Sequence, residues 1–586
     1  MRTFPRWPSV RNHGLAAGTL FAAMLSLWTS GCVSAGTAAG AAGEGAYGRR
    51  EERVQIGSFA SVPAVAVSRR FVYAAGTDGV AIYDRAFNRW LPPLSTGAGP
   101  DAALFAQPIG FLVGDPLEDA LWIGVPGAVL TYRPDTEQLQ RTMVVGTPDF
   151  LVFDRSGNGD AYVRSAGQYT RISRVGITSP VMSLPPSSAL LIPPTLTDLY
   201  RQFPTLRNQP QLFLRTQAPQ RALRPATLLA GAASPERASE VWLGTDSEGL
   251  FRFDPTFLQA TPLPYGLMSP GVGALALAAD GVWAASLGVT GMSPGVSSVM
   301  AFGAPGSLRG GLSFVSNNLQ QFRWLDGTIA VPLAGVRTYV MATRGARAWI
   351  GTERGVVRMK LDGANETLAW SALDGLPDPR VLSIAARDDG AWVGTMRGLR
   401  FVPDSGDGPG KRPVMAVSGA RALDNMAVYA LQMVGDTLWA GTESGLLAIA
   451  QPMQEATLLR PESSDPALRR PVRALAWSDT VLLAVTDDAV LQIAPRSARP
   501  VSRLEALRVS QVGQAIRAGL DERAVWIAGP EGVLLQTRSG GAVRWLRRGI
   551  ELDGPALDIV ASREWFWIGT PRGLLRLRRT SDGLVP

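Results

Sequence analysis

Short stretches in which apolar residues alternate with small or polar ones recur along this chain of 586 residues. The stretch AWIGTERG at residues 348–355 is closely repeated as FWIGTPRG at residues 566–573. Alternation at every second residue is typical of a half-buried β-strand, and a closing glycine suits a tight turn. Further alternating runs precede and follow each stretch, such as LLRLR at residues 574–578. Each unit therefore predicts about four short antiparallel strands.

An aromatic residue recurs at one position of these units. The repeat aromatics are Tyr73, Trp122, Tyr162, Trp242, Trp283, Trp349, Trp392, Trp439, Trp526 and Trp567, and Leu483 takes the position in an eleventh unit. From Trp349 onward, the units follow one another every 41 to 47 residues. Four strands at such a spacing are typical of a β-propeller, in which aromatic side chains fill the space between neighbouring sheets. We interpret these aromatics as core residues rather than as a sugar-stacking platform.

The fold prediction is an all-β protein made of two consecutive β-propellers. Residues 55–325 would form the first ring and residues 326–586 the second, with about six four-stranded blades in each. A single ring of 11–12 blades is the alternative, although ordinary propellers have about four to eight blades.

Three units, LWAGTESGLL, VWLGTDSEGLFRFD and FWIGTPRGLLRL, together resemble the two-component regulator propeller repeat. The resemblance extends over about residues 60–580. It implies the periplasmic sensor half of hybrid histidine kinases, often built as two consecutive propellers. An outer-membrane assembly lipoprotein with quinoprotein-type blades is similar in layout, but these units lack its A-x-D-x-x-T-G ending.

The first residues predict export from the cytoplasm. Residues 1–32 combine three arginines, the apolar stretch LAAGTLFAAMLSLW at 15–28 and the small residues that precede Cys32, as a secretory signal does. The sequence resembles a bacterial lipoprotein signal, with Thr29 where leucine is usual, and this implies that lipid attached to Cys32 anchors the protein to a membrane. Residues 33–54 are expected to be a flexible tether. We expect a periplasmic or cell-surface location, with the outer membrane favoured.

The composition excludes several functions. The formal net charge is +8, but no basic stripe indicates nucleic-acid binding. The one histidine, His13, lies in the predicted signal, and the one cysteine, Cys32, would carry lipid. The mature chain would thus have no histidine and no free thiol for Ser–His–Asp or Cys–His catalysis or for imidazole metal sites. We expect no catalytic residue, no metal and no cofactor. A carboxylate-based glycan-cleaving enzyme is an alternative.

The stretch DRSGNGD at residues 154–160 matches the opening of an EF-hand calcium loop. Asp154 and Asp160 stand at suitable positions, but Ser165 stands where a bidentate glutamate is required. We interpret the stretch as a hairpin turn, with a weak calcium site as the alternative.

An insertion at residues 185–228 interrupts the repeat, because 80 residues separate Tyr162 from Trp242. Thr197 and Asp198 are a candidate helix cap. The candidate partner-binding residues of the insertion are Tyr200, Arg201, Phe203, Arg207, Phe213 and Arg215. The alternative is a lid over one propeller end or a flexible loop, and a second insertion at about 287–312 is expected to be a mobile loop.

We therefore expect a lipid-anchored, non-catalytic envelope protein that binds a protein or glycan partner. Besides the glycan-cleaving enzyme, a further alternative is a ligand-sensing subunit that works with a separate two-component kinase. If the insertion binds the partner, its removal should abolish capture and leave the melting temperature nearly unchanged.

Overall fold

The computed structural model describes most of the chain after residue 51. The described ranges are 52–76, 79–95, 109–155, 158–208, 226–237, 239–288, 310–326, 333, 336–362, 366–405, 412–418, 421–450, 457–459, 465–478, 480–495 and 499–586. Within them, no helix is both long and apolar enough to cross a membrane. The predicted signal, Cys32 and the tether up to residue 51 lie outside the described residues.

The described strands form eleven antiparallel sheets, and strands that follow one another along the chain are neighbours in nearly all of them. The strands of the first four sheets are β2 (Ala64–Val67), β3 (Phe71–Gly76), β4 (Gly79–Asp84), β5 (Arg89–Ser95), β6 (Phe111–Gly114), β7 (Leu121–Val125), β8 (Ala128–Arg133), β9 (Gln138–Met143), β10 (Pro148–Asp154), β11 (Ala161–Ser165), β12 (Gln168–Ile172), β13 (Thr178–Val181), β14 (Leu190–Leu191), β15 (Leu228–Ala233), β16 (Val241–Thr245), β17 (Leu250–Asp254) and β18 (Gln259–Leu263). We call these four sheets the four-blade group.

The other seven sheets contain the rest of the strands. They are β19 (Val272–Ala278), β20 (Gly281–Ser286), β21 (Gly311–Ser316), β22 (Phe322–Asp326), β23 (Thr338–Arg344), β24 (Arg347–Thr352), β25 (Gly355–Lys360), β26 (Thr367–Trp370), β27 (Val381–Ala386), β28 (Gly390–Thr395), β29 (Gly398–Pro403), β30 (Met415–Ala416), β31 (Val428–Val434), β32 (Thr437–Thr442), β33 (Gly445–Ala450), β34 (Thr457–Leu459), β35 (Val472–Ser478), β36 (Val481–Thr486), β37 (Val490–Ala494), β38 (Arg499–Arg503), β39 (Arg517–Leu520), β40 (Ala524–Gly529), β41 (Gly532–Thr537), β42 (Val543–Arg547), β43 (Asp558–Ala561), β44 (Trp565–Thr570), β45 (Gly573–Arg578) and β1 (Arg53–Ile56).

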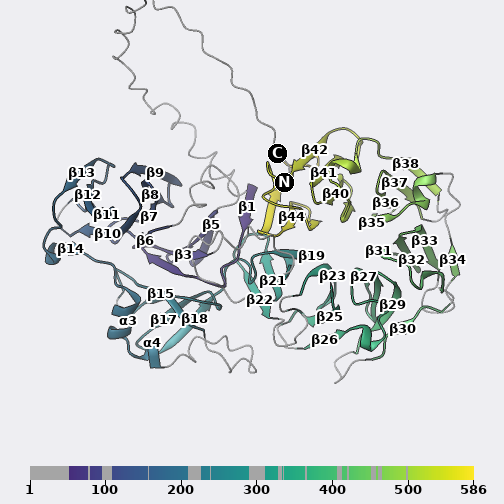
Figure 1. Cartoon of the computed structure of the whole chain (residues 1–586), viewed down its shortest axis with the longest axis horizontal. Helices are drawn as coiled ribbons and strands as arrows, with labels where there is room; N and C mark the ends of the chain where they lie inside the picture. Colours follow the sequence, from purple (N-terminus) through teal and green to yellow (C-terminus); the bar gives the residue numbers. More distant parts are fainter. Residues whose placement is uncertain are drawn as a thin grey trace, which may run out of the picture. The chain divides into compact units, whose positions relative to one another are not determined.

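These seven sheets form a closed ring, which we call the seven-blade ring. The first strands β19, β23, β27, β31, β35, β39 and β43 contact one another in that order, and β43 contacts β19 (Figure 1). Four-stranded antiparallel sheets arranged around a ring are a β-propeller. The all-β propeller prediction is therefore confirmed.

The last sheet of the ring is completed from the other end of the chain. Its order is β1-β45-β44-β43, and Arg53 to Ile56 pair antiparallel with Leu577 to Leu574. Val54 and Ile56 are buried. The predicted tether at 33–54 therefore extends too far, since its last two residues belong to this strand.

The predicted boundary between the two groups of sheets, at residue 325, is not the boundary that the contacts between first strands show. In the four-blade group, β15 contacts β2, β2 contacts β6 and β6 contacts β10. The sheet β19–β22, at residues 272–326, has its first strand between β43 and β23 and so belongs to the seven-blade ring. The division is thus four and seven sheets rather than about six and six. Periodicity alone counts units, whereas ring membership depends on which first strands meet.

All ten repeat aromatics lie on the second strand of their sheets and are buried. Trp349, for example, is fully buried and stacks on Trp370 with 5.6 Å between the ring centroids. The rest of the repeated phrase forms the next turn: Thr352 Oγ1 donates a 2.8 Å hydrogen bond to the Gly355 carbonyl. Gly355 has φ +135°, and a Cβ there would lie 2.0 Å from the Trp370 oxygen. The phrase therefore encodes one packing position and one turn.

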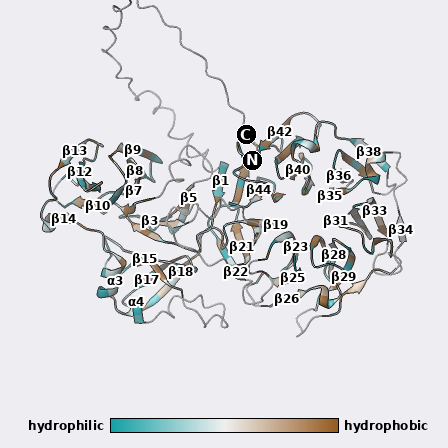
Figure 2. Cartoon of the chain, viewed as in Figure 1, coloured by the Kyte–Doolittle hydropathy of each residue, from teal (hydrophilic) through white to brown (hydrophobic). Residues whose placement is uncertain are grey.

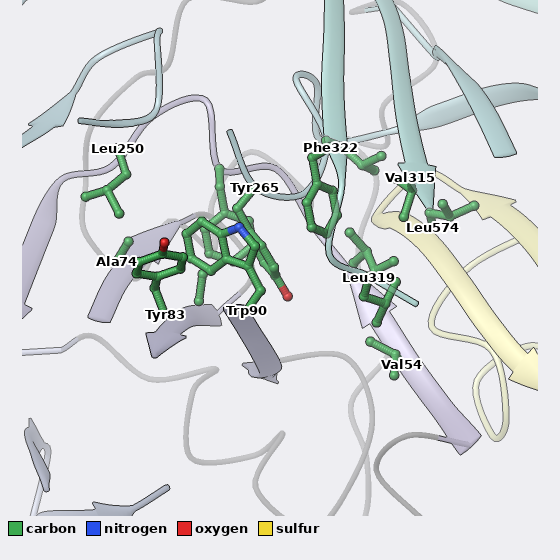
Figure 3. Packing of buried hydrophobic residues seen from close by; sticks show 14 of the residues in the cluster. Val54, Ala74, Tyr83, Trp90, Leu250, Tyr265, Val315, Leu319, Phe322 and Leu574 are labelled. Atoms are coloured by element: carbon green, nitrogen blue, oxygen red, sulfur yellow. The ribbon is translucent and has the colours of Figure 1, made fainter. Parts of the chain in front are cut away.

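Hydrophobic residues run along the strands of both sets of sheets (Figure 2). One buried cluster contains residues of both sets (Figure 3). In it, the Tyr265 ring lies 4.4 Å from that of Trp90 and 4.6 Å from that of Phe322, measured between centroids. Burial raises the pKa of Tyr265, so its hydroxyl stays neutral. This aromatic contact joins the sheet β2–β5 to the sheet β19–β22.

Candidate functional site at the mouth of the seven-blade ring

A cavity of about 280 Å³ lies where the first strands of the seven-blade ring begin. Each of the seven sheets contributes to its wall. The lining residues are Gly273, Leu287, Arg337, Thr338, Tyr339, Leu382, Met396, Tyr429, Arg473, Gln514, Ala515, Ile516, Arg517 and Leu557. The cavity is therefore a property of the ring as a whole and not of one blade.

Irregular strand pairing turns side chains toward this cavity. The register between first and second strand shifts between Val472 and Ala474, so that Arg473 is the extra residue. Four other sheets of the ring have a shift at the corresponding place, and their extra residues are Gly273, Tyr339, Leu382 and Tyr429. A β-bulge redirects a side chain out of the regular alternation. All five of these residues line the cavity.

Arg517 is held by groups from two other strands and by the carbonyl of the residue before it. Its Nε donates a 3.0 Å hydrogen bond to Asp558 Oδ1, its NH1 a 3.2 Å bond to the Ile516 carbonyl, and its NH2 a 2.5 Å bond to the Tyr339 carbonyl. Tyr339 is on β23, which β43 and β19 separate from β39 around the ring. The side chain of Arg517 therefore reaches from β39 past two first strands to β23, and it lines the cavity on its way.

Arg473 is held against the wall by a carboxylate and an aromatic ring. Its Nε and NH2 donate to Asp487 at 2.9 and 3.3 Å, and its guanidinium carbon lies 4.3 Å from the Tyr429 ring centroid. When the side-chain oxygen of Gln514 faces Arg473, it accepts hydrogen bonds from the guanidinium nitrogens at 3.0–3.2 Å. Burial lowers the pKa of Arg473, but the bond to Asp487 more than offsets this, and the pKa is raised overall. Arg473 is thus a fixed cation.

Arg337 differs from the other two arginines because no described carboxylate pairs with it. Its guanidinium carbon lies 5.2 Å from the centroid of the Tyr339 ring. Its Nε is buried and has no hydrogen-bond partner among the described residues. An unpaired buried donor costs about 1–3 kcal/mol, so a ligand that accepts from it gains accordingly.

Among the described residues, the charges of the site sum to a single uncompensated cation. Asp558 balances Arg517 and Asp487 balances Arg473, which leaves Arg337. The lining contains no aspartate, glutamate or histidine within the described chain. No group of three metal-binding side chains occurs among the described residues either. The arrangement suits an anion with an apolar neighbour rather than a metal ion.

The predicted insertion forms two short helices against the four-blade group. They are α3 (Leu196–Gln202) and α4 (Thr205–Asn208). The N-cap of α3 is Thr195, whose side chain accepts from the Asp198 amide, while the Asp198 carboxylate accepts from the Thr195 amide. Of the two predicted capping residues, Asp198 therefore belongs to the cap and Thr197 does not. Leu199 and Leu206 are buried, and α3 contacts β15. This part of the insertion therefore packs against the sheet β15–β18.

The predicted partner-binding residues of the insertion separate into two kinds. Tyr200 and Phe203 are half-buried and pack against the apolar cluster beneath α3. Arg201 and Arg207 are exposed, and Arg201 NH1 lies 2.7 Å from Asp198 Oδ1. Phe213 and Arg215 lie outside the described residues. None of the four described residues lines the cavity of the seven-blade ring.

The stretch at residues 154–160 joins β10 to β11. The amide of Asp154 donates a 2.8 Å hydrogen bond to the Asp160 carbonyl, as in a hairpin connection. Arg171 Nε donates a 2.6 Å bond to Asp160 Oδ2. The carboxylate at the last position of the stretch is thus engaged by an arginine.

The repeat pattern of the sequence did not point to the arginines of the cavity. A weak signal exists, because each of the three arginines follows valine or isoleucine at the start of a first strand or, for Arg337, directly before it. Other units place other residues there, such as Gly273 and Leu382. Only the ring brings these positions together.

No protein-family model and no curated protein sequence matches this chain. Among solved structures, PorZ, a surface component of the type-IX secretion system of Porphyromonas gingivalis, is 12% identical, with 88% of this chain and 68% of PorZ covered and a TM-score of 0.41. The extracellular domain of BT4673 from B. thetaiotaomicron, described as a hybrid two component system, is 13% identical, with coverages of 88% and 69% and a TM-score of 0.39. BamB from Moraxella catarrhalis is 9% identical, with coverages of 60% and 98% and a TM-score of 0.35.

Proposed function

We propose that this protein is a non-catalytic recognition module of the cell envelope, which binds an anionic group of a protein or glycan partner at the mouth of the seven-blade ring. The observation that carries the proposal is Arg337, the one arginine of the cavity that lacks a carboxylate partner among the described residues. Ligand sites are commonly concave and mostly apolar, with a few placed polar groups. This cavity has that composition.

The construction of the cavity favours binding over catalysis. Arg517 and Arg473 are fixed by carboxylates behind them, and the lining offers no described carboxylate or imidazole to move a proton. A glycan-cleaving enzyme would need two carboxyl groups that flank a bond. We therefore prefer recognition to hydrolysis at this site.

We further propose that lipid on Cys32 holds the protein at a membrane. The support is the sequence of residues 1–32, and β1 begins only 21 residues after Cys32, at Arg53. A tether of that length would keep the seven-blade ring near the membrane surface. Mass spectrometry of the N-terminal peptide should find acyl chains, and Cys32→Ser should move the protein from the membrane fraction to the soluble one. Unchanged fractionation would contradict the anchor.

Binding of anions can be tested by thermal unfolding of the purified protein. Acetate, hexanoate, glucuronate, phosphate and sulfate are compared with methylammonium at one ionic strength. A ligand that binds only the folded state raises the melting temperature. At least one anion should do so in the wild type and not in Arg337→Met. Equal shifts in both proteins, or no shift with any anion, would contradict the proposed site.

A further inference from the structure

We infer that the ligand of this cavity carries one carboxylate on a compact apolar body. This inference rests on the proposed anion-binding function and narrows it to a chemical class. Two independent features of the wall lead to it, namely the charge balance of the arginines and the apolar surface beside them.

The charge balance favours a monoanion. Asp558 is buried and lies 3.0 Å from Arg517 Nε, so this pair enters the cavity wall already neutral. Asp487 lies 2.9 Å from Arg473 Nε and neutralises the second arginine. Of the charged residues described in the lining, Arg337 then remains to balance a ligand. A dianionic phosphate would bring one more negative charge than the wall can balance in a partly desolvated site.

The shape of the donors also favours a carboxylate. A guanidinium offers a planar fork that matches the two oxygens of a carboxylate. Arg517 bonds through all three of its nitrogens to protein oxygens, and Arg473 bonds to Asp487 through two. Arg337 is the arginine whose fork is not engaged by a described partner, and its Nε is buried. We assign it as the residue that binds the carboxylate.

The rest of the wall is apolar and fits the body of the ligand. The apolar lining residues are Leu287, Leu382, Met396, Ala515, Ile516 and Leu557. The half-buried rings of Tyr339 and Tyr429 add two aromatic surfaces. Each methylene moved from water into such surroundings tightens binding by about fourfold. A short acid with a longer alkyl chain should therefore bind better than acetate until the cavity is full.

Two sources could supply such a group, a free carboxylic acid or the C-terminal residue of a polypeptide with an apolar side chain. Calorimetric titration of the full mature chain separates them. One arm uses acetate, butyrate, hexanoate and octanoate, with hexanamide and hexylphosphonate as the uncharged and dianionic controls. A second arm uses a peptide that ends in leucine and the same peptide with a C-terminal amide.

Hexanoate should bind at least tenfold more tightly than acetate, hexanamide or hexylphosphonate. Arg337→Met should weaken hexanoate at least tenfold, whereas Arg344→Met, at the other end of β23 and paired with Asp388, should not change it. Tighter binding of the acid peptide than of the free acid, lost on amidation, would identify a chain terminus as the source.

Failure of this inference is distinct from failure of the proposed function. If phosphate, sulfate or glucuronate binds in an Arg337-dependent way while hexanoate binds no better than acetate, the carboxylate inference is wrong and the anion site stands. If no anion depends on Arg337, both are wrong. A variant that melts at the wild-type temperature shows that lost binding is not lost folding.

Discussion

Asp558 on β43 accepts a 3.0 Å hydrogen bond from Arg517 Nε on β39, and the same carboxylate also accepts a 2.7 Å bond from the Leu275 amide on β19. These strands are neighbours in the seven-blade ring. One buried side chain therefore joins three sheets at the point where the ring closes between its last sheet and its first.

Replacement of Asp558 by alanine should lower the free energy of unfolding by about 3–5 kcal/mol, since it leaves the half-buried Arg517 without a carboxylate and the Leu275 amide without its acceptor. Burial raises the pKa of Asp558 although Arg517 and two backbone amides favour its charged form, so folding does not favour the charge overall. Asp558→Asn, which keeps an acceptor, should cost clearly less. Urea unfolding of both variants is the measurement, and equal losses would show that the charge and not the bonding matters.

The repeat of strands could be read from the sequence because it is local. Trp349 and the turn from Thr352 to Gly355 lie within eight residues. The alternation indicates a strand, the aromatic residue indicates a packing position, and the glycine indicates a turn. The all-β fold and the burial of the aromatics follow from this pattern. The strand β1 was missed because only four residues, separated by more than 500 from their partner β45, form it.

The cavity could not be predicted in the same way. Arg473 faces it because of a one-residue shift in strand pairing, and such a shift depends on how two strands pair, which the residues of one strand do not show by themselves. Arg517 meets Tyr339 only because seven first strands close into a ring. The insertion was easier to see, because it breaks the repeat, but that break says nothing of what Leu199 packs against.

Stability in acid should depend on Asp84. Burial alone raises the pKa of Asp84, but the guanidinium of Arg70, 2.6 Å away, and the amides of Ala86 and Phe87 more than offset it, so the pKa lies below its ordinary value of 3.8. A carboxylate with a lowered pKa stabilises the fold above the pKa of the unfolded chain, and this contribution is lost as the pH falls through the folded value. Asp84→Asn should therefore be less stable by about 1–3 kcal/mol at pH 7, and the difference should shrink below pH 3.8. A difference that does not change with pH would rule out this ion pair as the cause.

Two repeat tryptophans should respond differently to phenylalanine. Trp122 Nε1 donates a 3.0 Å hydrogen bond to Asp115 Oδ2, whereas Trp567 Nε1 is buried without a partner among the described residues. Trp122→Phe loses both the hydrogen bond and side-chain volume. Trp567→Phe loses the same volume, but it removes a donor whose burial without a partner was unfavourable. The first variant should be less stable than the second by about 1–3 kcal/mol in urea unfolding. The reverse order would show that packing volume dominates at both positions.

The insertion should now be tested by point substitutions rather than by deletion. Leu199 is fully buried beneath α3, so Leu199→Ala should cost about 2–5 kcal/mol, and removal of residues 196–225 should lower the melting temperature. This replaces the expectation that the deletion leaves the melting temperature unchanged. Arg201→Glu and Arg207→Glu change exposed positions and should leave it within about 1 °C of the wild type. Those variants measure partner binding without loss of fold.

Closure of the seven-blade ring by β1 makes a matched pair of truncations informative. A chain that begins at Gly57 lacks β1, exposes the edge of β45 and loses the buried Val54 and Ile56, each worth about 1.5–3 kcal/mol. It should melt several degrees lower than the wild type and aggregate through the open strand edge. A chain that begins at Arg50 keeps β1 and should melt as the wild type does. Equal melting of the two truncations in scanning calorimetry would mean that the seven-blade ring is held closed by the contact of β43 with β19 and does not need its N-terminal strand.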